Sequence, residues 1–256
     1  MTDARPTALV MAEEVAGELM KAGVRAVVLT GSHARGDATP QSDIDLYAIG
    51  DGPDYRLERR HEYLVSVSWR TEEHIVRAFE SPPDVGGLVP GWRQAIVLAD
   101  PSGVAAGLIG RARSWSWAVI GDQLLNEWVA EQLAGYAEEV HKLVSHLAQR
   151  KLQFAAVQRS LLALRLPVIM AVHKRILYDS ENDLWDLVAD RMDVDWAKNQ
   201  VAALGLTGRP FHESCDGALA LYVLACESAS SLFDPRQKTV VDHACDLARQ
   251  AATMSI

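Results

Sequence analysis

The chain has 256 residues, of which 49% are hydrophobic, so it can bury a substantial core and fits one large domain or two smaller ones. A net charge of −9 argues against nucleic acid as the main ligand, because phosphate backbones require a basic surface. Three widely spaced cysteines with no CxxC pair are typical of reduced thiols in a cytoplasm, not of a disulfide framework or a zinc site.

The first hundred residues alternate between helix and strand signals. The opening stretch carries Glu13 and Glu14 among its apolar residues, so we expect an amphipathic helix there and neither a signal peptide nor a membrane span. Apolar alternation and β-branched residues then predict strands, while "GSHARGDA" is typical of a short helix that ends at Gly36. The expected elements are a helix over 7–21, strands over 24–30, 43–49 and 62–69, and the short helix from residue 31.

Two further elements and a loop follow. Thr71 is a good N-cap for a helix whose first turn holds Glu72 and Glu73. The Pro/Gly-rich stretch "SPPDVGGLVPGW" predicts a loop, and "QAIVLADP" predicts a strand that Pro101 stops.

Beyond about residue 103 the apolar residues recur at a helical period and strand signals are scarce. We therefore expect an α+β fold, with a small mixed sheet and flanking helices in a domain over 1–115, and an all-helical domain over 116–256. The helices expected in the second part cover 126–148, 154–178, 184–191, 196–204, 212–232 and 237–252.

Two aspartates lie two residues apart in the strand "DIDLYAI". Side chains alternate along a strand, so Asp43 and Asp45 point to the same face. Adjacent carboxylates repel each other and lose hydration, an arrangement that a divalent cation between them stabilises. Carboxylate oxygens suit Mg²⁺, which commonly binds one or two carboxylates together with substrate phosphates. The sequence therefore predicts a magnesium site at Asp43 and Asp45.

Gly31 and Ser32 follow the first strand and open a turn or short helix. Free backbone N–H groups and a hydroxyl at such a position form an anion site. A phosphate cradle beside a two-carboxylate metal site indicates phosphoryl or nucleotidyl transfer.

The segment "GSHARGDATPQSDIDL" resembles the signature of the polymerase-β-like nucleotidyltransferase superfamily. The resemblance implies Mg²⁺ as cofactor and transfer of a nucleoside monophosphate from a nucleoside triphosphate such as ATP. By this match Gly31 and Ser32 hold the triphosphate, and Asp43 and Asp45 hold the metal. Arg35, one helical turn after Ser32, is a candidate phosphate contact, although a solvated helix arginine is an equally good interpretation.

The superfamily usually has a third carboxylate on the next strand, and here the alternation of "EYLVSVSW" puts Ser66 at that position. Three interpretations remain open. Two carboxylates hold the metal with water and substrate, which we favour, or Glu62 reaches in from the strand end, or the metal site is degraded and the chain is an inactive scaffold.

A helix stripe in the second half carries Glu131, Glu138 and Lys142 at helical spacing. "EEVHK", followed through an apolar helix by "AVHKRILYDSENDLWDLV", resembles the helical domain of aminoglycoside nucleotidyltransferases of the kanamycin nucleotidyltransferase (4'-adenylyltransferase) type. This resemblance implies Glu138 as general base on the antibiotic hydroxyl and Lys142 as a phosphate contact. Glu131 is the second choice for the base and, with Glu62, a candidate substrate contact.

The resemblance implies a cytoplasmic enzyme that adenylylates an aminoglycoside and so confers antibiotic resistance. Its expected partners are a cationic aminoglycoside and a nucleoside triphosphate, with no nucleic acid and no membrane, and the expected assembly is a homodimer. The alternatives are another hydroxylated antibiotic such as a lincosamide, or a protein-adenylylating antitoxin-type enzyme.

Overall fold

The computed structural model describes the backbone of residues 7–253 and the side chains of residues 7–251. The ends of the two expected domains, residues 1–6 and 254–256, therefore lie outside the described residues. The chain divides into two compact units at Val119/Ile120. We expected the boundary between residues 115 and 116, which is one residue beyond the end of helix α5 (Val104–Ser114).

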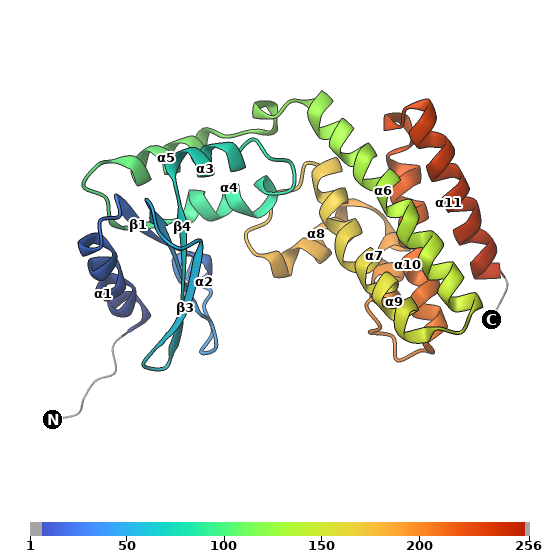
Figure 1. Ribbon diagram of the computed structural model, residues 1–256, viewed down its shortest axis with the longest axis horizontal. Helices are drawn as coiled ribbons and strands as arrows, with labels where there is room; N and C mark the ends of the chain where they lie inside the picture. Colours follow the sequence, from blue (N-terminus) through green and yellow to red (C-terminus); the bar gives the residue numbers. More distant parts are fainter. Residues whose placement is uncertain (1–6, 254–256) are drawn as a thin grey trace. The chain divides into compact units, whose positions relative to one another are not determined.

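The first unit is built on a five-stranded mixed sheet in the order β3-β4-β2-β1-β5 (Figure 1). Only β2 and β4 run parallel, and the other neighbours are antiparallel. The expected small mixed sheet is confirmed, with one strand more than the sequence predicted. The strands are β1 (Ala26–Thr30), β2 (Ile44–Ile49), β3 (Tyr55–Arg60), β4 (Tyr63–Arg70) and β5 (Ile96–Ala99).

Helix α1 (Ala8–Lys21) covers one face of this sheet. Its buried side chains, among them Met11 and Val15, pack against Val27, Leu46 and Val67 from the three central strands. On the other face, Tyr47 of β2 contacts the ring of Trp92, with ring centroids 5.6 Å apart. Trp92 belongs to α4 (Val85–Gln94), so the two faces of the sheet are covered by different helices.

Three helices besides α1 and α5 complete the first unit: α2 (Gly31–Arg35), α3 (Glu72–Ala78) and α4 (Val85–Gln94). The short helix at Gly31, its end at Gly36 in a left-handed conformation, and the Thr71 cap are confirmed. The loop expected over "SPPDVGGLVPGW" is wrong, because most of it forms α4. Burial of Val85, Val89 and Trp92 along one side of this helix overrides the weak helix propensity of its glycines and Pro90.

The second unit is all helical, as the sequence predicted. Its helices are α6 (Asp122–Ala148), α7 (Leu152–His173), α8 (Leu184–Arg191), α9 (Val194–Ala203), α10 (Phe211–Ser228) and α11 (Pro235–Thr253). Helix α10 packs against α6, α7, α9 and α11. Inside this bundle the buried Tyr222 hydroxyl donates a hydrogen bond to the Leu133 carbonyl at 3.0 Å.

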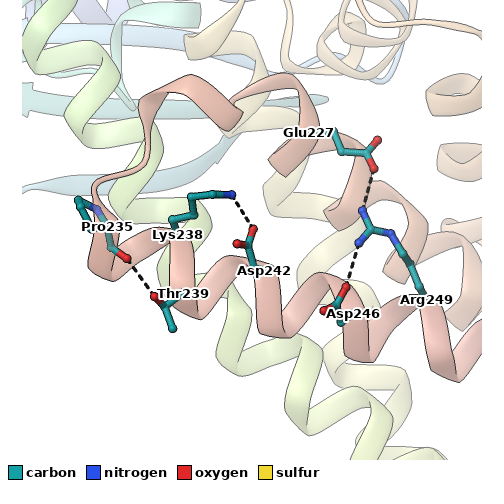
Figure 2. A network of polar contacts seen from close by, with 7 residues as sticks. All are labelled: Glu227, Pro235, Lys238, Thr239, Asp242, Asp246 and Arg249. Atoms are coloured by element: carbon teal, nitrogen blue, oxygen red, sulfur yellow. Dashed lines mark hydrogen bonds and ion pairs between the residues drawn. The ribbon is translucent and has the colours of Figure 1, made fainter.

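One ion pair on the surface of the bundle joins α10 to α11, and further polar contacts lie within α11 (Figure 2). Arg249 of α11 forms ion pairs with Glu227 of α10 at 2.8 Å and with Asp246 at 3.2 Å. The cysteines, Cys215, Cys226 and Cys245, are buried and free, as expected of reduced thiols.

Helix α7 is the one candidate membrane span among the described residues, with a mean hydropathy of 1.5. Half of its most apolar window (50%) is buried against the other helices. Length and composition alone are therefore weak grounds for a membrane span, since a core helix has the same properties.

Candidate active site

Three adjacent strands place Thr30, Asp45 and Ser66 in one row across the sheet. Thr30 of β1 is paired with Asp45 of β2, and Asp45 is paired with Ser66 of β4. The Ser66 hydroxyl donates a hydrogen bond to Oδ1 of Asp45 at 2.7 Å. The position that the resemblance reserves for a third carboxylate is therefore directly beside Asp45, and a serine occupies it.

The first turn of α2 lies against the same carboxylate. Gly31 has φ +67°, a conformation that suits glycine, and a Cβ built on it would lie 2.2 Å from Oδ2 of Asp45. Because only a hydrogen occupies that space, the backbone of Gly31 and Ser32 begins its helix in contact with the aspartate. The structure thus brings the glycine-serine turn and one member of the aspartate pair side by side.

Asp43 precedes β2 by one residue, and both aspartates are half-buried. Burial raises the pKa of Asp45, the Ser66 hydrogen bond lowers it, and the negative charge of Asp43 raises it again. The two carboxylates are thus close enough to repel each other. A bound cation would offset both the cost of burying the charge of Asp45 and the repulsion between Asp45 and Asp43.

Two basic side chains of α2, those of His33 and Arg35, act on the negative charge of Asp45. His33 and Arg35 each lower the pKa of Asp45 through their charge, although less than the three effects above. Arg35 also pairs with Asp37 through its Nε at 3.1 Å, and its side chain is 18% exposed. Arg35 therefore lies near enough to Asp45 for its charge to act on that carboxylate.

His33 is a site residue that sequence reasoning missed. Its Nε2 is buried without a hydrogen-bond partner within the described part of the chain. Its ring packs edge-on against the ring of Tyr63, with ring centroids 6.3 Å apart. The only sequence signal was its place in "GSHARG", immediately after the glycine-serine turn.

Glu62 is not brought to the aspartates. It lies exposed in the two-residue turn that joins β3 to β4. Four residues of extended chain separate it from Ser66, a span of about 13 Å. Glu62 is also absent from the charges that act on Asp45.

The donor set at Asp43 and Asp45 fits a magnesium ion. Both residues offer carboxylate oxygens, the ligands that Mg²⁺ prefers, and the backbone of Gly31 lies against Oδ2 of Asp45. Within residues 7–253 no cluster of three or more His, Cys, Asp or Glu side chains could hold a metal. At Asp43 and Asp45 the protein would supply two carboxylates, and the remaining ligands would come from substrate phosphates and water.

Glu138 and Lys142 lie one turn apart on α6. The Lys142 ammonium pairs with Glu138 at 2.9 Å and with Glu139 at 3.1 Å. The hydrogen bond and charge of Lys142 lower the pKa of Glu138. Both acids raise the pKa of Lys142 in return. The structure thus places Glu138, the residue predicted as general base, beside Lys142, which was predicted as a phosphate contact.

Glu138 also lines an open groove between α6 and α11 of about 660 Å³. The rings of His141 and His243 lie side by side in it, with centroids 5.0 Å apart. Glu131 is exposed on the same helix, two turns or about 10 Å before Glu138, and does not line this groove. The other lining residues are Ala134, Gly135, Ala137, Thr239 and Val240, which make the groove largely apolar.

Residues 12–79 match the family model described as a nucleotidyltransferase domain. The match supports the nucleotidyltransferase superfamily. It includes Gly31, Ser32, Asp43, Asp45 and Ser66, and so contains the whole row and turn described above. Nucleotidyl transfer with a nucleoside triphosphate and a divalent metal is the chemistry that this family generally performs.

A solved structure has a similar fold over most of the chain. A nucleotidyltransferase-like protein from Exiguobacterium sibiricum 255-15 superposes with a TM-score of 0.54 at 11% sequence identity. The alignment covers 95% of this chain and 89% of that one. At this identity the likeness concerns the fold alone, and it confirms the α+β fold class. A search of curated proteins finds no significant match.

Proposed function

We propose that this chain transfers AMP from Mg-ATP to a hydroxyl group of an aminoglycoside antibiotic and releases pyrophosphate. The observation that carries the proposal is the contact of the Gly31 turn with Asp45 beside Asp43, inside the match to a nucleotidyltransferase domain. The net charge of −9 favours a cationic acceptor. Resistance would follow from the modified hydroxyl, in a cytoplasmic enzyme that we expect to act as a homodimer.

On the donor side, Asp43 and Asp45 would hold Mg²⁺, which when bound neutralises negative charge on the triphosphate. The backbone N–H groups at Gly31 and Ser32 would bind phosphate oxygens at the start of α2. Arg35, which already acts on the charge of Asp45, would contact the same phosphates. Together these groups favour the binding of a polyphosphate in complex with a divalent cation.

On the acceptor side, Glu138 would accept the proton of the attacking hydroxyl. The hydroxyl oxygen then forms a bond to the α-phosphorus while the bond from that phosphorus to pyrophosphate breaks. Lys142 holds the Glu138 carboxylate in place through their ion pair at 2.9 Å. Lys142 would also contact a phosphate, and Glu131 is the alternative base.

A second candidate acceptor is a less polar hydroxylated antibiotic such as a lincosamide. The observation that favours it is the apolar lining of the groove beside Glu138. An aminoglycoside would leave much of that lining without an apolar partner, whereas a lincosamide would bury it.

The test is to incubate the full chain with Mg²⁺, ATP and separate panels of aminoglycosides and lincosamides. Pyrophosphate release and the mass of the modified antibiotic are measured, with Asp45→Asn as the inactive control. Turnover with one panel identifies the acceptor class. If no antibiotic is modified while a co-expressed protein becomes adenylylated, the proposal fails and the antitoxin-type activity replaces it.

A further inference from the structure

Ser66 is tied to the metal-binding carboxylate by more than its position in the strand. It is 7% exposed, pairs with Asp45 in the parallel β2–β4 register and donates its hydroxyl hydrogen to Oδ1. On the other side of the same carboxylate, Oδ2 faces Gly31. The two oxygens of Asp45 therefore have different surroundings, since Oδ1 accepts the Ser66 hydrogen bond and Oδ2 lies against the backbone of Gly31.

This arrangement limits the number of divalent cations that the site can bind. A third carboxylate at position 66 would join Asp43 and Asp45 to give the site three negative side chains, a richer ligand set of the kind that two-metal sites use. A serine hydroxyl is neutral and donates its hydrogen to Asp45, so it adds no charge. The protein then offers only the carboxylates of Asp43 and Asp45, in agreement with the absence of a larger ligand cluster among the described residues.

From this geometry we infer that the donor site holds a single divalent cation and that Ser66 is a positioning residue, which fixes the carboxylate of Asp45 for that cation. The inference rests on the proposed function insofar as the cation is the one that accompanies the nucleotide. It concerns the number of ions and the role of Ser66, which the choice of acceptor does not affect.

The experiment counts bound Mn²⁺, which accepts the same oxygen ligands as Mg²⁺ and can be measured by electron paramagnetic resonance. The full-length protein is titrated with Mn²⁺ alone, and the titration is repeated on Asp45→Asn. Because an acidic surface also binds Mn²⁺ weakly, only the sites lost in Asp45→Asn are counted. We expect one such site per chain. Two sites lost in Asp45→Asn would overturn the inference.

Variants at position 66 test the positioning role. Ser66→Ala should still bind one Mn²⁺, but about tenfold more weakly, because hydrogen bonds to a ligand hold it in its binding orientation. Ser66→Thr keeps the hydroxyl and should restore the affinity, which a purely structural effect of Ser66→Ala would not predict. Unchanged affinity in Ser66→Ala would overturn the positioning role.

Ser66→Asp tests the number of ions from the opposite direction. A folded Ser66→Asp, checked by circular dichroism, should bind a second Mn²⁺ per chain, and a count that stays at one would contradict our account of the charge. If Ser66→Asp does not fold, the counts for the natural chain and Ser66→Ala still decide the question. If the protein modified no acceptor, the proposed function would be wrong, but the Mn²⁺ counts would still be valid. Failure of the proposed function can therefore be told apart from failure of this inference.

Discussion

A Cβ on Gly31 would lie 2.2 Å from Oδ2 of Asp45, so the first residue of α2 and the aspartate of β2 occupy adjoining space that no larger residue at position 31 could share. The contact joins a backbone turn to a carboxylate 14 positions further along the chain.

Gly31→Ala should therefore damage the site and the fold together. The added methyl group must displace Asp45, and the positive φ of residue 31 costs about 1–2 kcal/mol for a residue with a Cβ. We expect loss of Mn²⁺ binding and of nucleotidyl transfer, measured by titration and pyrophosphate release, and a lower melting temperature. Gly17→Ala is the matched control, because Gly17 is an exposed position of α1 with open space around its Cβ. It should be neutral or stabilising by up to about 1 kcal/mol, and a loss of function in this control would contradict the explanation.

Asp45→Asn should abolish transfer yet stabilise the metal-free protein at neutral pH. The folded pKa of Asp45 is raised, mainly by burial, so the folded state binds its proton more readily than the unfolded state. Stability from this group is therefore present below the unfolded pKa and is lost as pH rises through the folded pKa. In chelator at pH 7 the asparagine variant should melt higher than the natural chain, and the difference should vanish towards the ordinary pKa of 3.8. Asp51→Asn, an exposed carboxylate after β2, should show no such gain.

Glu138→Gln should lower the rate of transfer by about 100-fold or more if Glu138 is the general base, because amides do not accept the proton. Binding of ATP, followed by calorimetry, should stay unchanged. Glu131→Gln is the matched control on the same helix and should retain most activity. Full activity in Glu138→Gln with a loss in Glu131→Gln would instead assign the base to Glu131.

Tyr222→Phe should destabilise the helical unit by about 1 kcal/mol, the usual contribution of a hydrogen bond between neutral groups. The buried hydroxyl of Tyr222 donates a hydrogen bond to the Leu133 carbonyl at 3.0 Å. The phenylalanine variant removes this hydroxyl and keeps the ring. Chemical denaturation of the full chain measures the effect. Because Tyr222 lies in the helical unit, Mn²⁺ binding at Asp45 should be unaffected, and a loss there would show that the variant acts on the whole chain.

The sequence predicted the elements that carry the donor site because their signals are local. The glycine-serine turn, the alternation of β2 and the cap at Thr71 each depend on a few neighbouring residues. Strand β3 was missed because its residues are largely charged, as suits an edge strand that avoids further pairing. Helix α4 was missed because its stability depends on tertiary burial of Val85, Val89 and Trp92.

The site itself was predictable only in part. Alternation along β4 indicated Ser66 as the residue at the third-acid position, but its hydrogen bond to Asp45 depends on the parallel register of β2 and β4, which no local signal reports. His33 was missed for the same reason, since its effect on Asp45 follows from how α2 lies against β2. The domain boundary and the acceptor residues stay predictions.

The row of Thr30, Asp45 and Ser66 has a consequence for how such a protein can evolve. These side chains stand on three adjacent strands whose register is fixed by backbone hydrogen bonds and by the packing of α1 on the opposite face. An exchange at position 66 therefore alters the charge beside Asp45 while the supporting backbone stays in place. A lineage could gain or lose an acidic side chain there by a few nucleotide changes, and so shift its preference among cations without remodelling a loop.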